Sequence, residues 1–307
     1  MKRAPDNPHP LRPGLLDMLA GYDRRTAIAD TTAGAITAIL LVPQGMAYAL
    51  LAGLPAQYGL YAAIFPPAVY ALFGTSRTLA VGPVAVAALM VADALAGYAD
   101  TQGEWIEGAI VLSAEVGLLL LVAGLLGLGR LVAFVSHPVL SGFTSAAALL
   151  ILISQGGALL GIDLPRGTAP VMLEALLARA GAIDPATAAT AGAAIAALLA
   201  GRTPARRGLE GLGVARDTAR LLTRTVPLLI VVAATGVVAL LAGAGTPPVA
   251  VVGTIPAGLP TPGAGLIGAS GWVTLLPSAA LIALIGYVES ITVARVLAAR
   301  RRERGDP

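Results

Sequence analysis

Residues 26–51 read TAIADTTAGAITAILLVPQGMAYALL, a long apolar stretch without Lys or Arg. An α-helix needs about 20 such residues to cross roughly 30 Å of hydrocarbon. Further apolar windows without Lys or Arg cover residues 58–73, 79–95, 106–128, 131–153, 185–200, 226–241 and 276–294. We therefore expect an all-α polytopic membrane protein with about eight transmembrane spans.

The composition indicates the same class. The chain of 307 residues is 57% hydrophobic and 12% charged, against roughly 25% charged in a soluble domain. It has no Cys and two His, which leaves few residues for disulfides, thiolate chemistry or a soft-ligand metal site. The sequence also lacks a Walker-type phosphate loop, a nucleophile elbow and a dinucleotide fingerprint. These features exclude a water-soluble enzyme, and we expect neither catalysis nor a cofactor.

The basic residues are distributed unevenly between the two faces of this topology. With eight spans, successive loops lie on alternate sides of the membrane. Of the 20 Lys and Arg residues, only Arg166 and Arg179 then lie on the side opposite the termini. The positive-inside rule then predicts cytoplasmic termini in a cell inner or plasma membrane. The Arg-rich loop 202–224 has no interleaved aromatic residues, so we expect it to attract anionic lipid heads rather than nucleic acid.

Glycine and proline occur inside the spans as well as between them. The chain has 37 Gly and 22 Pro, and interrupted membrane helices need a lined cavity or neighbouring helices to satisfy their free backbone groups. Such broken helices are typical of transport sites. The uncharged segment 246–271, rich in Pro and Gly, is expected to be an extended external linker between two blocks of spans.

The first span contains the motif VPQGMAY from Val42. Pro43 has no N–H to donate, which predicts a kink at mid-membrane. Gln44 and Tyr48 are four residues apart, so they share one helix face and offer amide and phenol groups at that depth. These groups either bind a ligand or hold neighbouring helices together, and the motif alone leaves both interpretations open.

The third span opens with AVGPVAV from Ala80. Gly82 permits a sharp turn and Pro83 suits the first helical position, so a helix is expected to begin there. If this start lies inside the bilayer, the free N–H groups of Val84, Ala85 and Val86 would stabilise an anion, aided by the helix dipole. The alternative is an ordinary span with Pro in its first turn at the membrane surface.

The eighth span carries an acidic residue, Glu289. With a helix start near Pro277, this carboxylate lies about 18 Å along the helix, beyond the centre of the membrane. Acidic residues at such depth usually serve proton or cation pathways, so Glu289 is a candidate coupling residue. It could instead be a structural carboxylate paired with Arg295. Glu115 and Asp93 are weaker candidates, because Glu115 has no motif around it and Asp93 lies near the external end.

Two long motifs, VPQGMAYALLAGLPAQYGLYA from Val42 and FGTSRTLAVGPVAV from Phe73, carry a family resemblance. Together they resemble the signature of the SulP sulfate permeases, which belong with solute carrier family 26. Three more motifs follow in the order that this family shows: SHPVLSGFTS from Ser136, VGTIPAGLP from Val252 and LIGYVESI from Leu284.

The resemblance implies a transporter fold of two inverted repeats of seven helices with a discontinuous third helix. A core domain would move against a gate domain, the anion would lie between the third and tenth half-helices, and a cytoplasmic STAS domain would follow. The resemblance also implies roles for particular residues. Those expected at the anion site are Gln44, Tyr48, Gly82, Pro83, Val84 and Ala85, and Glu289 is expected to couple H⁺ or Na⁺.

On this basis we expect three regions. Residues 1–25 form a cytoplasmic N-terminal segment, residues 26–298 a partial transmembrane domain with spans one to eight, and residues 299–307 a basic tail without a STAS domain. The expected function is secondary active transport of sulfate, bicarbonate or a dicarboxylate with H⁺ or Na⁺, in a truncated form. The alternative is a non-transporting membrane remnant or interaction partner without a complete site. We expect the chain to self-associate, as a homodimer, or to recruit another subunit.

Overall fold

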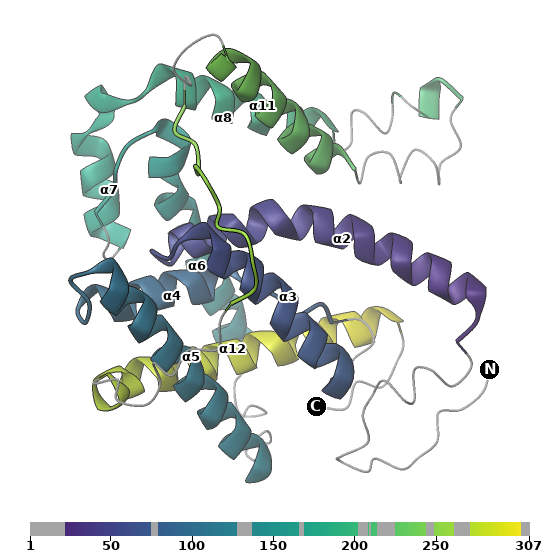
Figure 1. Ribbon diagram of the computed structural model, residues 1–307, viewed down its shortest axis with the longest axis vertical. Coiled ribbons are helices and arrows are strands. Elements are labelled where there is room, and N and C mark those ends of the chain that lie inside the picture. Colours follow the sequence, from purple (N-terminus) through teal and green to yellow (C-terminus); the bar gives the residue numbers. More distant parts are fainter. Residues whose placement is uncertain are drawn as a thin grey trace. The chain divides into compact units, whose positions relative to one another are not determined.

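The computed structural model describes a helical protein in two compact units. The residues described are 22–74, 79–127, 137–165, 169–201, 208, 210–213, 225–243, 249–260 and 271–301. Helices form within this part of the chain and no β-strand does (Figure 1), which confirms the expected all-α class. Unit 1 comprises residues 1–37, 41–136 and 256–307, and unit 2 comprises residues 38–40 and 137–255.

The helices of unit 1 come from both ends of the sequence. They are α2 (Arg24–Leu51), α3 (Ala56–Phe73), α4 (Ala85–Ala96), α5 (Gln102–Leu125) and α12 (Trp272–Arg301). Within this unit, α12 packs against α5 and α4, and α4 packs against α5. In this unit, the helix formed by the eighth apolar window of the sequence therefore packs against the helices formed by the third and fourth windows.

Unit 2 holds the helices from the middle of the chain. They are α6 (His137–Leu160), α7 (Ala169–Ala178), the 3-10 turn η2 (Ala180–Ala182), α8 (Pro185–Gly201) and α11 (Val226–Gly243). Each apolar window of the sequence overlaps a helix of one of the units, whereas α7 lies in a segment expected to be an external loop. The Arg-rich loop 202–224 lies mostly outside the described residues. In the linker 246–271, the described residues 249–260 form neither helix nor strand.

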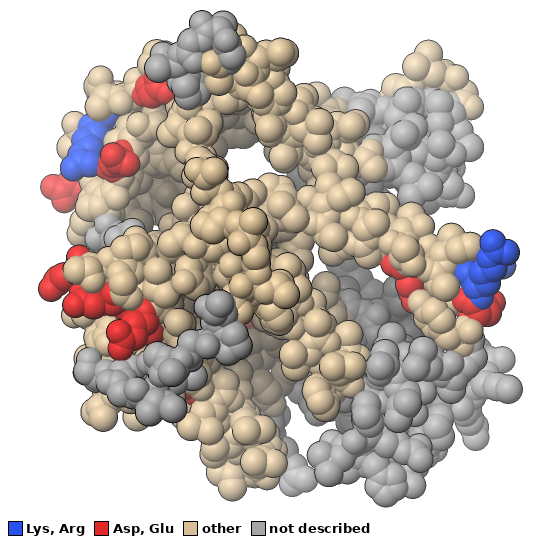
Figure 2. Space-filling view, in the orientation of Figure 1, with Lys and Arg blue, Asp and Glu red and all other residues tan. Residues whose placement is uncertain are grey.

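Several of these helices suit a bilayer by length and composition. Among the described residues, three helices are long and apolar enough to cross a membrane: Arg24–Leu51, Gln102–Leu125 and Trp272–Val293. Shorter apolar helices accompany them, including Ala85–Ala96 and Pro185–Gly201. Figure 2 shows charged side chains gathered in a few small patches, one of them at the start of α2, while the rest of the described surface in this view is uncharged.

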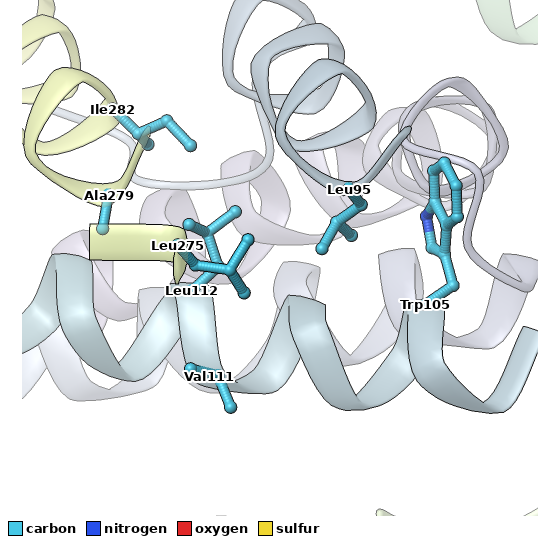
Figure 3. Close-up of a cluster of buried hydrophobic side chains, with 7 residues drawn as sticks. All are labelled: Leu95, Trp105, Val111, Leu112, Leu275, Ala279 and Ile282. Atoms are coloured by element: carbon cyan, nitrogen blue, oxygen red, sulfur yellow. The ribbon is translucent and has the colours of Figure 1, made fainter. Parts of the chain in front are cut away.

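A tightly packed cluster holds α4, α5 and α12 together. Its buried members are Leu95, Trp105, Val111, Leu112, Leu275, Ala279 and Ile282 (Figure 3). Leu112 and Leu275 meet between α5 and α12, and the small Ala279 allows the two helices to approach closely. In a bilayer this contact is stabilised by van der Waals packing rather than by the removal of apolar surface from water.

Helices α2 and α3 touch through glycine. A Cβ atom placed on Gly59 would lie 1.9 Å from the carbonyl oxygen of Gly45, so these two backbones can meet only because both residues lack a side chain. The Cβ atom of Ala49 lies at the same contact, 3.0 Å from a Cβ atom placed on Gly59, and Ala56 on α3 is also buried. The helix α2 is also continuous through Pro43. One face of α2 therefore packs against α3, and a neighbouring face carries Gln44 and Tyr48.

Candidate functional site

The start of α4 offers backbone N–H groups without a side-chain cap. Val84, the residue before the helix, is extended with φ −126° and ψ 144° and makes no capping hydrogen bond through its side chain. The N–H of Ala88 donates to the carbonyl oxygen of Val84 at 3.1 Å, the first such bond of the helix. The N–H groups of Ala85, Val86 and Ala87 therefore precede the helical hydrogen-bond ladder, at the positive end of the helix dipole.

This geometry corrects the expected helix start. The helix begins at Ala85, two residues after Pro83, so Val84 belongs to the extended segment before it. The donors are consequently the N–H groups of residues 85–87 rather than 84–86. The physical reason is the local preference of the side chains: β-branched Val favours extended backbone, whereas Ala is the strongest helix former.

The segment before α4 lies against α2. A Cβ atom placed on Gly82 would lie 3.6 Å from Cδ1 of Leu41, an ordinary van der Waals distance. Leu41, Gln44 and Tyr48 follow one another at spacings of three and four residues, so they share one face of α2. The approach to α4 is therefore next to the face of α2 that carries the two polar side chains.

Gln44 and Tyr48 bond to each other within α2. The side-chain Nε2 of Gln44 donates to the Tyr48 hydroxyl oxygen at 3.1 Å, with Gln44 exposed and Tyr48 half-buried. The bond uses one of the two N–H donors of Gln44 and leaves the hydroxyl hydrogen of Tyr48 free to donate elsewhere. This bond lies within one helix, so it does not itself join α2 to another helix.

Glu289 is half-buried on α12. The helix begins at Trp272, where the N–H of Leu275 donates to the carbonyl oxygen of Gly271 at 2.8 Å, and not near Pro277 as expected. The proline sits in the second turn, where it omits one hydrogen bond without ending the helix. Glu289 consequently lies about 26 Å from the helix start, at about 1.5 Å per residue. The side chain of its alternative partner Arg295 lies outside those described.

Two other intramembrane acids differ sharply in burial. Asp93 on α4 is exposed, whereas Glu115 on α5 is 2% exposed. Both carboxylate oxygens of Glu115 lack a hydrogen-bond partner among the described residues. The sequence held a signal for this burial, because Glu115 follows Gly108 and Leu112 at spacings of four and three residues on one helix face.

Apolar helices, an uncapped helix start and a nearby pair of polar side chains are features that are typical of polytopic membrane transporters. The sequence profile described as the sulfate permease family matches residues 28–307, so the chain belongs to this family. Its members are transporters rather than enzymes.

Relatives and solved structures agree with this membership. The chain is 51% identical over 153 residues to the chloroplastic sulfate transporter 4.1 of Arabidopsis thaliana, an alignment covering 49% of this chain and 22% of that protein. Its structure is similar to SLC26A9, with a TM-score of 0.80 and 25% identity over 96% of this chain and 47% of the other. The transmembrane domain of the cyanobacterial bicarbonate transporter BicA gives a TM-score of 0.73 at 22% identity, covering 93% and 69% of the two chains. The chain thus spans about a fifth of the plant relative and about half of SLC26A9.

Proposed function

We propose that this chain binds an inorganic anion at the start of α4, as part of a secondary active transporter driven by H⁺ or Na⁺. Sulfate is the first candidate because the plant relative is named a sulfate transporter, and bicarbonate and dicarboxylates are the alternatives. The observation that carries the proposal is the position of Gly82, where an added Cβ atom would lie 3.6 Å from Leu41 on the face of α2 that bears Gln44 and Tyr48.

The chemistry of this arrangement suits an anion. Three N–H groups and a partial charge of roughly +0.5 at the helix start attract negative charge without introducing a full positive charge into the membrane. Gly82 has no side chain to obstruct the approach. Gln44 and Tyr48 supply further donors on the adjoining face, which would replace part of the anion's hydration shell.

We assign the coupling role to Glu289. It lies on α12, which packs against α4 in unit 1. A charged carboxylate deep in a membrane helix is energetically unfavourable, and such residues usually bind a proton or cation that moves along a transport pathway. Binding of H⁺ or Na⁺ there would offset the negative charge of an anion carried by the same unit.

Three further assignments accompany the proposal. Unit 1 corresponds to the core part of the transporter and unit 2 to the gate part, which the division of the described helices supports. The uneven distribution of Lys and Arg supports cytoplasmic termini in a cell inner or plasma membrane. Self-association as a homodimer is compatible with the many apolar side chains that these helices expose.

Binding of radiolabelled sulfate, bicarbonate and fumarate to the purified protein in nanodiscs tests the proposal. We expect saturable binding of at least one anion and a weakening by Gln44→Leu of about 1 kcal/mol, or about fivefold in Kd. The matched control is Thr37→Val on the same helix, because the Thr37 hydroxyl donates to the carbonyl of Ala33 within α2. Equal affinities in the wild type and Gln44→Leu, or no saturable binding of any of the three anions, would refute the site.

A further inference from the structure

Glu115 is a buried carboxyl group that the proposed anion site does not use. It is 2% exposed on α5, and neither carboxylate oxygen has a hydrogen-bond partner in the described part of the chain. Buried polar groups in proteins are nearly always hydrogen-bonded, so an isolated carboxylate requires another explanation.

The residues one helical turn from Glu115 along α5 are apolar. Leu112, one turn earlier on the same face, packs with Leu275 and Ala279 of α12 (Figure 3), and Val116 and Leu119 of α5 pack against the same cluster. Among the described helices, α12 and α4 pack most extensively against α5, and Trp105 at its start also bonds to Ala52 at the end of α2. The described titratable side chains on α12 and α4 are Tyr287 and Glu289 of α12 and Asp93 of α4, and the loop before α5 adds Tyr98 and Asp100. None of them is hydrogen-bonded to Glu115.

A proton is the ligand that fits these surroundings. An ionised carboxylate without a partner is strongly unfavourable in an apolar interior, whereas a protonated carboxyl is far less so. A bound metal cation would need several oxygen ligands. No group of three or more His, Asp or Glu side chains lies together among the residues described. The packing of α5 against α12 and α4 therefore accommodates the neutral acid.

We propose that Glu115 is a proton-binding site, protonated in the packed state described here and deprotonated when the helices around it separate and admit water. The proton adds to one carboxylate oxygen and leaves from the same atom, and no other bond changes. Because burial excludes water from Glu115, the proton can exchange only after the contact between α5 and α12 opens. Protonation is thereby linked to conformation, which is the requirement for coupling. This inference rests on the proposed transport driven by H⁺ and adds a second site beside Glu289.

Infrared difference spectroscopy of the purified protein during a pH titration tests proton binding directly. We expect a protonated carboxyl band that is lost in Glu115→Gln and retained in Glu107→Gln, which alters a half-buried carboxylate on the same helix. A band that is unchanged in Glu115→Gln overturns the proposal.

Transport in proteoliposomes tests the coupling. Uptake driven by a pH gradient should fall about tenfold or more in Glu115→Gln, while anion exchange at equal pH persists. Unchanged uptake under the pH gradient overturns the coupling role. If the wild type moves no anion, this chain does not transport by itself; the nanodisc binding test then decides the proposed anion site, and the infrared titration decides whether Glu115 binds a proton. Should Glu115→Gln not fold, Glu115→Leu replaces it, because an apolar side chain suits this packing; it must also lose the band.

Discussion

The indole Nε1–H of Trp105 donates to the carbonyl oxygen of Ala52 at 2.9 Å, which joins the first turn of α5 to the end of α2. The neighbouring residue Gly53 completes the contact, since its carbonyl accepts from the side chain of Gln102 at 3.2 Å. Gly53 has φ +77°, and a Cβ atom there would lie 2.8 Å from Cε2 of the indole. Both its backbone conformation and its surroundings therefore require glycine. This contact fixes the end of the helix that carries Gln44.

Gly53→Ala should destabilise the protein by about 1–2 kcal/mol or more, because the left-handed backbone is unfavourable for alanine and the methyl group meets the indole ring. Thermal unfolding in detergent measures this change. The control is Gly34→Ala in α2, where nothing lies within 4 Å and alanine should stabilise the helix by up to about 1 kcal/mol. Equal unfolding temperatures for the two variants would contradict the role of Gly53.

A second prediction concerns the space before α4. Gly82→Ala should retain anion binding, since its Cβ would stand at an ordinary 3.6 Å from Leu41. Gly82→Val should abolish binding, because the larger side chain displaces Leu41 or occupies the approach to the helix start. Anion binding in nanodiscs measures both variants. If valine were as well tolerated as alanine, the anion would not bind beside Gly82.

The sequence predicts the helices of this fold well because each apolar run is long and free of Lys and Arg. It predicts helix starts less well. At Pro277, the rule that Pro favours the first turn places the start of α12 five residues too late. The residues before Pro277 include Leu275, which packs in the buried cluster with Leu112 of α5, and such a tertiary contact cannot be read from the local sequence. The shared face of Gln44 and Tyr48 follows from their spacing alone.

Other features of the site depend on residues that are far apart in the sequence. The approach of Leu41 to Gly82 joins α2 to the extended segment before α4, and no local sequence pattern predicts it. Glu115 is buried in a unit where α5 packs against α12, a helix from a distant part of the chain. Helix periodicity shows which face Glu115 occupies, but not which helix covers that face.

The start of α8 should be sensitive to acid. The carboxylate of Asp184 accepts hydrogen bonds from the hydroxyl and the backbone N–H of Thr187, which hold its pKa below the ordinary value. Since the folded pKa is lowered, the stabilisation is present above the unfolded pKa and is lost as the pH falls through the folded value. Amide hydrogen exchange over residues 185–190 should therefore show loss of protection in acid. Asp184→Asn caps the helix without titrating, so its protection should not depend on this group.

The coupling role of Glu289 predicts a separation of two measurements. Glu289→Gln should weaken uptake driven by an H⁺ or Na⁺ gradient more than it weakens anion binding, because the amide neither titrates nor attracts a cation as strongly. Proteoliposome uptake and nanodisc binding on the same preparation provide the comparison. Thr292→Val, one turn further along α12, is the matched control, since the Thr292 hydroxyl donates to the carbonyl of Val288 at 2.7 Å. Gradient dependence that is unchanged in Glu289→Gln would reject the role.

The orientation of the chain is tested by cysteine labelling, for which the native sequence provides a background without Cys. The uneven distribution of Lys and Arg predicts that Gly211 faces the cytoplasm and that residues 249–260 face outside. The structure guides the choice of the second site. Gly258 has φ +122°, which is strained for any other residue, so the exposed neighbour Ala257 is the better position. In intact cells, a membrane-impermeant maleimide should label Ala257→Cys and reach Gly211→Cys only after the membrane is opened. Labelling of Gly211→Cys in intact cells would reverse the proposed orientation and would place the Arg-rich loop 202–224 outside, against the positive-inside rule.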